Sequence, residues 1–167
     1  MLKKIVLGLT LLSSLTFGID LQTEDKIKGV YKELGIENKL NYSTFFKAIQ
    51  GYNKIDGKKE GYITIIDFSK PSNEERFFVI DLENKKVNYS TYVSHGKNTG
   101  LDTAVKFSNK MNSYQSSLGF YLTINTYEGS NGYSLRLKGL EPGIRILGEV
   151  SKEKADILRE ADDIFIE

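Results

Sequence analysis

Two different hydrophobic periods divide the chain, and they limit its possible folds more than any other feature of the sequence. Between Gly61 and Lys138, apolar residues alternate with polar ones or run continuously over strand-length segments, as β-strands require. Before Gly61, and again over Ser151–Ile166, apolar residues recur every three or four positions, which is typical of amphipathic helices. The sequence therefore predicts a mainly β domain that two helices precede and one helix follows.

The two N-terminal helices have recognisable boundaries. The first is expected to begin after Thr23, whose hydroxyl can cap it, and to end at Gly35. The second is expected to begin at Asn41 and to end near Tyr52. Phe45, Phe46 and Tyr52 form an aromatic cluster at helical spacing, which favours burial in the core over a role in partner binding. We expect both helices to pack on the sheet.

Several strand-length segments follow, separated by turn residues. Glu83 and Asn84 separate two of these segments by a short turn, which predicts an antiparallel hairpin. A further strand is expected to begin near Gly119, and another contains Arg136 on its polar face. With the strand near Gly119, the expected strands are Gly61–Phe68, Arg76–Leu82 and Lys85–Ser94, which form the hairpin, and Tyr133–Lys138, which contains Arg136.

A serine-rich loop leads into the strand near Gly119 and is the most distinctive local pattern in the chain. In Ser113–Tyr121, SYQSSLGFY, small hydroxyl residues meet a glycine that can adopt a positive φ or permit a close backbone approach. The loop would place Ser116 and Ser117 at the mouth of the sheet. A plain tight turn into a strand accounts for the same composition.

A second polar loop, His95–Ala104, follows the predicted hairpin and contains the only histidine of the chain. A lone imidazole can titrate, bind a metal or take a proton, but catalysis or metal binding needs partner groups that the sequence does not place nearby. Arg136 can pair with a peptide carboxylate or can simply be solvated. The predicted substrate-binding residues are His95, Ser116, Ser117, Gly119 and Arg136, with no catalytic or metal-binding residue and no cofactor.

Two carboxylates fall inside strand patterns. Asp67 and Asp81 would form an acid–base pair only if the fold brought them together, and nothing in the sequence does so. We expect each to accept hydrogen bonds from a nearby turn instead.

Composition excludes several classes of binding partner and of cysteine chemistry. The 167 residues include 23 Lys and Arg against 22 Asp and Glu, so the formal net charge of +1 provides no field that would attract nucleic acid or an anionic membrane. The chain has no cysteine, which excludes disulfides, thiolate nucleophiles and zinc–thiolate sites. The length suits one domain of ordinary size.

The first eighteen residues have the pattern of an export signal. Lys3 and Lys4 precede a short apolar run, and small residues stand near Gly18. The apolar run is shorter than the roughly 20 residues that a membrane span requires. We therefore expect cleavage after about Gly18, export to the periplasm or to the cell exterior and cell wall, and no stable membrane insertion afterwards.

Four motifs in the middle of the chain carry a family resemblance. In order they are SHG (Ser94–Gly96), FSN (Phe107–Asn109), SYQSSLGFY (Ser113–Tyr121) and YEGSNGYSLRLKGLEPG (Tyr127–Gly143). Over residues 23–143 the chain resembles the murein L,D-transpeptidase catalytic-domain family. The resemblance implies a β-rich fold, export, and peptidoglycan stem peptides as partners.

The same resemblance raises the question of activity. The family's cysteine nucleophile lies in a later GRSxGCP-type motif, after an HG-containing strand that supplies the catalytic histidine, and neither motif is present. His95 matches the earlier SHG motif instead. The chain is thus expected to be an incomplete, inactive member of the family. Two alternatives remain open: a non-catalytic module that binds cell-wall peptides, or a truncated chimeric fragment without function.

The sequence changes character after Gly143. Residues 144–167, IRILGEVSKEKADILREADDIFIE, resemble a C-terminal stretch of guanosine monophosphate synthase, which suggests a tail of foreign origin. The alternative is a genuine family member whose helical tail closes the domain differently. The sequence-based division is therefore a signal peptide at 1–18, a helical lead-in at 19–60, an incomplete L,D-transpeptidase-like β domain at 61–143, and a helical tail at 144–167.

Overall fold

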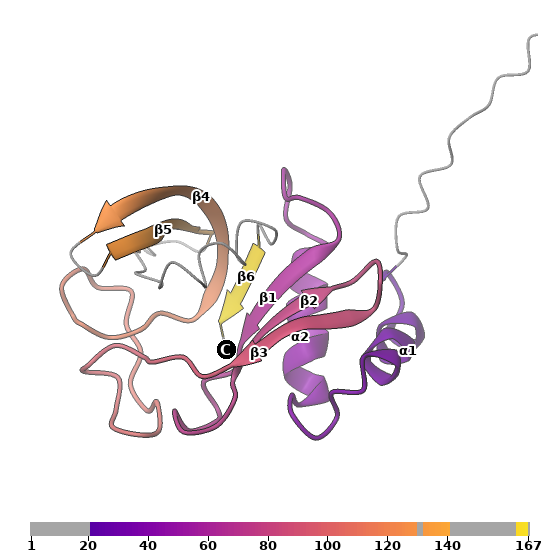
Figure 1. Ribbon diagram of the computed structural model, residues 1–167, viewed down its shortest axis with the longest axis horizontal. Helices are drawn as coiled ribbons and strands as arrows, with labels where there is room; N and C mark the ends of the chain where they lie inside the picture. The colour runs from indigo at the N-terminus through magenta and orange to yellow at the C-terminus, as the bar shows by residue number, and fades with distance from the viewer. Residues whose placement is uncertain (1–20, 130–131, 141–162, 167) are drawn as a thin grey trace, which may run out of the picture.

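The computed structural model describes residues 21–129, 132–140 and 163–166, which form two helices and a six-stranded sheet (Figure 1). The strand order across the sheet is β3-β2-β1-β6-β4-β5. The described part of the chain is therefore mainly β, as the sequence predicts. The elements are α1 (Glu24–Leu34), α2 (Tyr42–Tyr52), β1 (Tyr62–Ile66), β2 (Phe77–Asp81), β3 (Lys86–Thr91), β4 (Gly119–Gly129), β5 (Gly132–Gly139) and β6 (Asp163–Ile166).

Both predicted N-terminal helices are confirmed, with their boundaries. The Thr23 hydroxyl accepts a hydrogen bond from the backbone N–H of Lys26, and Gly35 ends α1 in the left-handed conformation with φ 62°. Asn41 occupies the N-cap position of α2, but its side chain makes no capping hydrogen bond. Phe45 and Tyr52 are buried in the core, as predicted, whereas Phe46 is only partly buried and packs against it.

Among the described residues, four antiparallel strand pairs and one parallel pair build the sheet. The predicted hairpin is confirmed, because β2 pairs with β3 in antiparallel register, with a bulge between Val79 and Ile80. β1 pairs antiparallel with β2, and β4 pairs antiparallel with β5. β6 lies between β1 and β4, parallel to the first and antiparallel to the second. It therefore joins the two halves of the sheet.

The core has two parts, one on each face of β1 and β2. Ile63, Ile65 and Phe78 pack with the buried faces of α1 and α2. Phe77 and Val79 point the other way, into a cluster with residues of β4, β5 and β6. Figure 1 shows β4 as a strongly curved strand on the opposite side of the molecule from the helices. Burial on both faces explains why β1 and β2 are continuously apolar.

The structure corrects the prediction for the C-terminus. A helix was expected over Ser151–Ile166, but Asp163–Ile166 forms strand β6. The segment DIFI contains two isoleucines and a phenylalanine, which suit a strand between two partners, and pairing on both sides outweighs local helical periodicity. Residues 151–162 lie outside the described residues.

Two further predictions fall outside the described residues: the signal peptide at Met1–Gly18 and the apolar run at Ile144–Val150. Among the residues that the structure does describe, no helix has the length and apolar character needed to cross a membrane.

Candidate functional site

The predicted binding residues lie at the ends of strands and in the loops between them. His95 follows β3 by four residues, in the loop that the sequence predicts. Ser116 and Ser117 lie just before β4, and Gly119 is its first residue. Arg136 lies within β5. His95, Ser116 and Ser117 lie in two loops that are in contact through Ser116 and Gly96, and Gly119 follows the second loop.

A buried arginine that sequence reasoning did not single out holds His95. Arg76 immediately precedes β2 and is 0% exposed. Its Nη2 lies 2.8 Å from Nδ1 of His95. One feature of the sequence indicates this residue: an arginine at the start of an otherwise apolar strand needs partners inside the protein for its charge.

Backbone carbonyls satisfy most of the remaining donors of Arg76. Nε and Nη2 donate to the Val93 carbonyl at 3.0 and 2.7 Å, and Nη1 donates to the Lys70 carbonyl at 2.8 Å. The guanidinium also lies over the ring of Phe68, 4.9 Å from its centroid. Burial lowers the pKa of Arg76, and the nearby charge of Asp67 opposes that shift. Arginine keeps its charge at neutral pH because its ordinary pKa is so high.

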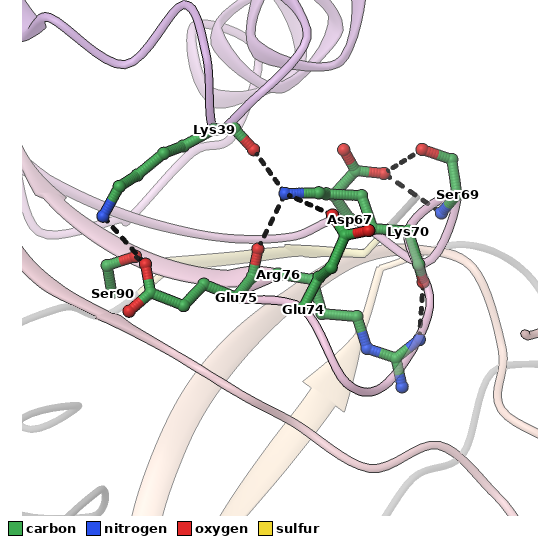
Figure 2. A network of polar contacts seen from close by, with 8 residues as sticks. All are labelled: Lys39, Asp67, Ser69, Lys70, Glu74, Glu75, Arg76 and Ser90. Carbon is green, nitrogen blue, oxygen red and sulfur yellow. Dashed lines mark hydrogen bonds and ion pairs between the residues drawn. The ribbon is translucent and has the colours of Figure 1, made fainter. Parts of the chain in front are cut away.

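A polar network fixes the turn that precedes Arg76 (Figure 2). Lys70 Nζ donates to the carbonyls of Lys39 and Glu75 at 2.9 and 3.0 Å. Lys39 Nζ in turn pairs with the Glu75 carboxylate at 2.8 Å, and the Ser90 hydroxyl donates to the same carboxylate. Hydrogen bonds from Lys39 and Ser90 lower the pKa of Glu75. The network ties the turn to the segment after α1 and to β3, so Arg76 approaches His95 from a fixed backbone.

The serine hydroxyls of the second loop are used inside the protein. Ser116 Oγ accepts a hydrogen bond from the backbone N–H of Gly96 at 2.9 Å, and the Ser116 N–H donates to Thr99 Oγ1 at 2.7 Å. Ser117 Oγ donates to the Ser108 carbonyl at 2.6 Å. The two bonds of Ser116 join the loop at 95–104 to the loop at 107–118, and the bond of Ser117 lies within the second loop.

Two glycines make this junction possible. A Cβ on Gly96 would lie 2.6 Å from the Tyr114 carbonyl oxygen and 2.9 Å from the Ser116 nitrogen, so the loops could not approach as they do. Gly119 has φ 127°, in the region that side chains rarely adopt, as the sequence suggests for this position.

Arg136 belongs to a separate part of the structure. Its guanidinium lies over the ring of Tyr127, 4.4 Å from the centroid, within the β4–β5 hairpin. Within the described residues it makes no hydrogen bond with the two joined loops. The predicted polar face of this strand is also only partly correct, because Ser134 and Leu135 are adjacent and both are buried.

The two strand carboxylates do not form an acid–base pair. Asp67 Oδ1 accepts hydrogen bonds from the N–H and hydroxyl of Ser69, and Asp81 accepts two from Asn84. Each therefore bonds its own turn, as predicted. Asp67 is fully buried, and its Oδ2 has no hydrogen-bond partner among the described residues.

A cavity of about 610 Å³ lies elsewhere, between α2 and the start of β4. Its lining includes Lys47, Lys54 and Phe120, and none of the predicted binding residues. Phe120 also packs closely against Gly51 of α2, because a Cβ there would lie 1.9 Å from its ring. This cavity is thus distinct from the junction of the two loops.

Comparison with known proteins identifies the domain. The family model described as "L,D-transpeptidase catalytic domain" matches residues 36–147, which contain β1 to β5 and both loops of the junction. The chain belongs to the L,D-transpeptidase catalytic-domain family. Peptidoglycan is the substrate that an L,D-transpeptidase domain implies in general terms. No solved structure matches the chain.

A shorter similarity links the chain to a different group of proteins. Over 25 residues it is 92% identical to the glutamine-hydrolysing GMP synthase of Fusobacterium nucleatum, 84% identical to that of Teredinibacter turnerae, and 76% identical to that of Neisseria meningitidis. The match covers 15% of this chain and spans only 5% of the length of each of these relatives. It confirms the expected resemblance to GMP synthase and concerns a single short stretch.

Proposed function

We propose that this chain is an exported L,D-transpeptidase-family domain that binds cell-wall peptides and does not itself catalyse acyl transfer. The observation that carries this proposal is that the predicted binding residues provide no free nucleophile. The sequence has no cysteine. The Ser116 hydroxyl accepts a hydrogen bond from the other loop, and the Ser117 hydroxyl donates one within its own loop, so both are engaged in structural bonds.

Acyl transfer needs an activated nucleophile with a base in hydrogen-bond reach. Ser117 Oγ donates a hydrogen bond to a backbone carbonyl, which cannot act as a general base. The imidazole of His95 directs Nδ1 toward Arg76. These contacts support a structural role for the serines and a non-catalytic role for the histidine.

Family membership supports peptidoglycan stem peptides as the ligands. The junction of the two loops places His95 beside a set of fixed backbone groups, and such loops on a rigid sheet commonly bind ligands. Of the predicted binding residues, Gly119 and the two serines would act by shaping the loops. Arg136 would contact a peptide only if the ligand extended along the β4–β5 hairpin.

The test uses the mature chain, residues 19–167, with synthetic tetrapeptide stems. Mass spectrometry is expected to show no crosslinked or trimmed product, and calorimetric titration is expected to show saturable binding of the stems. Turnover above a buffer blank that Ser117→Ala abolishes would overturn the inactivity. Absence of binding to the stems and to isolated peptidoglycan would overturn the binding function.

A second possibility, a chimeric fragment without function, is favoured by the 25-residue match to GMP synthases. In that case the codons near Gly143 would mark a recombination or an assembly error. Sequencing the genomic locus across residues 140–148 in independent isolates tests this directly. One continuous reading frame in every isolate would exclude an artefact.

A further inference from the structure

The contact between Arg76 and His95 determines which imidazole nitrogen carries the proton. A guanidinium has only donors, so the 2.8 Å contact requires Nδ1 of His95 to accept a hydrogen bond from Nη2. A neutral imidazole that accepts at Nδ1 carries its proton on Nε2. His95 therefore presents an N–H group on the side of the ring away from Arg76.

Arg76 cannot easily leave this arrangement. Three of its bonds go to the backbone carbonyls of Val93 and Lys70, and the side chain is fully buried. Moving the guanidinium would leave buried carbonyls and a buried charge without partners, which is strongly unfavourable. The acceptor state of Nδ1 is thus built into the fold.

Aromatic contacts hold the plane of the imidazole. The ring of Phe68 meets that of His95 edge-on, with centroids 6.0 Å apart, and stacks on Phe107 at 6.3 Å. His95 is only half-buried, and its Nε2 has no acceptor among the described residues. An oriented N–H donor thus lies beside an aromatic surface.

The charges around this donor select its acceptor. The guanidinium on Nδ1 polarises the ring, which strengthens the opposite N–H as a donor. Asp67 lies close enough to Arg76 for its charge to act on the guanidinium. A carboxylate oxygen is the acceptor that gains most from such a donor, because hydrogen bonds to charged groups are the strong ones.

We propose that His95 Nε2–H is a carboxylate-binding donor for the peptide ligand and that Arg76 is the positioning residue that fixes it in this role. The proposal rests on the proposed function, since it names the group of the peptide that the site recognises. It also assigns His95 a role other than general base or metal ligand, because Nδ1 is occupied and Nε2 is protonated.

The first experiment reads the tautomer directly. His95 is the only histidine of the chain, so its two ring nitrogens give an unambiguous pair of signals in a ¹⁵N NMR spectrum of labelled protein. We expect the proton on Nε2 at neutral pH, and we expect its signal to move on addition of a tetrapeptide stem. A proton on Nδ1, or a mixture of both tautomers, would overturn the proposal whatever the protein binds.

The second experiment compares a stem tetrapeptide with free carboxylates and the same peptide with each carboxylate converted to a primary amide. The acid form is expected to bind about tenfold more tightly or better, as a hydrogen bond to a charged group contributes. His95→Phe retains an aromatic ring but no donor, and should remove this preference. His95→Gln restores an N–H at a similar distance from the backbone, and should recover part of it.

Lys97→Gln is the matched control, because Lys97 is exposed in the same loop with its ammonium over the ring of Tyr114. It should leave the preference for the acid form intact, which separates a local donor from general charge attraction. Thermal unfolding of each variant checks that it is folded. Equal binding of both peptides by the parent chain would overturn the carboxylate site but leave peptide binding standing. Binding of neither peptide would instead overturn the proposed function, and this site with it.

Discussion

The backbone N–H of Gly96 donates to the hydroxyl of Ser116, 2.9 Å away and twenty residues along the chain. Ser116→Ala removes the acceptor and leaves a partly buried N–H without a partner. We expect the free energy of unfolding to fall by about 1 to 2 kcal/mol, which is typical of such a loss. Chemical denaturation measures it. Ser94→Ala, at an exposed position beside the same loop, should change the free energy of unfolding by less than about 0.5 kcal/mol. Equal effects of the two substitutions would contradict this role for Ser116.

Gly96 also explains why the loops can touch. In Gly96→Ala the new methyl group would lie within 3 Å of backbone atoms of Tyr114 and Ser116, which cannot move like the end of a side chain. We expect a loss of about 1 to 3 kcal/mol in unfolding free energy, as overpacking usually costs. Gly29→Ala is the control, because nothing lies within 4 Å of that position in α1. It should instead stabilise the protein by about 0.5 to 1 kcal/mol through helix propensity. A neutral Gly96→Ala would show that the loops are not in close contact.

The sequence predicted most helices and strands because residues close in sequence determine where these elements begin and end. The left-handed end of α1 needs Gly35, and the short turn at Glu83 and Asn84 closes the β2–β3 hairpin. The contact of Arg76 with His95 could not be predicted in this way. It joins residues nineteen positions apart through a buried guanidinium, and no sequence periodicity describes such a pair.

Strand β6 was not predicted because its local pattern allows two structures. Its segment has apolar residues that fit both a helix and a strand, and only the partners on each side decide between them. Pairing with β1 and β4 is a property of the tertiary structure, which the local pattern does not contain. For Arg136 the prediction was partly successful: the strand that contains it was predicted, but its stacking on Tyr127 was not.

Acid stability should depend on Asp81. Burial raises the pKa of this carboxyl, but hydrogen bonds from the side chain and backbone of Asn84, and from Tyr62, outweigh burial and lower it. The folded-state pKa therefore lies below that of the unfolded chain, and the unfolded chain binds more protons at low pH. The resulting stabilisation is complete above the ordinary Asp pKa of about 3.9 and is lost as the pH falls through the folded-state pKa.

Asp81→Asn should therefore lower stability at neutral pH and flatten its dependence on pH below about 4. Denaturation midpoints measured from pH 6 to pH 2 test both effects. Asp102→Asn, at an exposed position, should retain the parent's acid-induced loss. A parallel acid profile for Asp81→Asn and the parent would rule out a contribution from Asp81.

Export predicts a new N-terminus. The basic start, short apolar run and small residues near Gly18 fit removal by signal peptidase. Mass spectrometry of the exported protein should give a chain that begins near Ile19. An intact Met1 on exported protein would contradict cleavage, and Leu9→Arg, which interrupts the apolar run, should retain the protein inside the cell.

The position of β6 makes the C-terminus the most informative place to cut the chain. β6 pairs with β1 through Thr64, Ile65 and Ile66 on one side and with four residues of β4 on the other, so it connects the two halves of the sheet. Ile166 is buried in the core cluster that contains Phe77 and Tyr121. A tail that packed only loosely on the domain surface would have neither the pairing on both sides nor the buried isoleucine.

Ending the chain after residue 162 should therefore lower the free energy of unfolding by several kcal/mol, because it removes the buried Ile166 side chain and the pairing of β6 with two strands. The backbone groups of β1 and β4 that faced β6 would lose their partners, so their amides should exchange faster and the shortened protein should associate through these open edges. Hydrogen exchange and sedimentation measure these effects. A chain that lacks only Glu167 keeps β6 whole and serves as the control. Unchanged stability and exchange after the longer deletion would show that the tail is not integrated into the sheet, as a segment of foreign origin predicts.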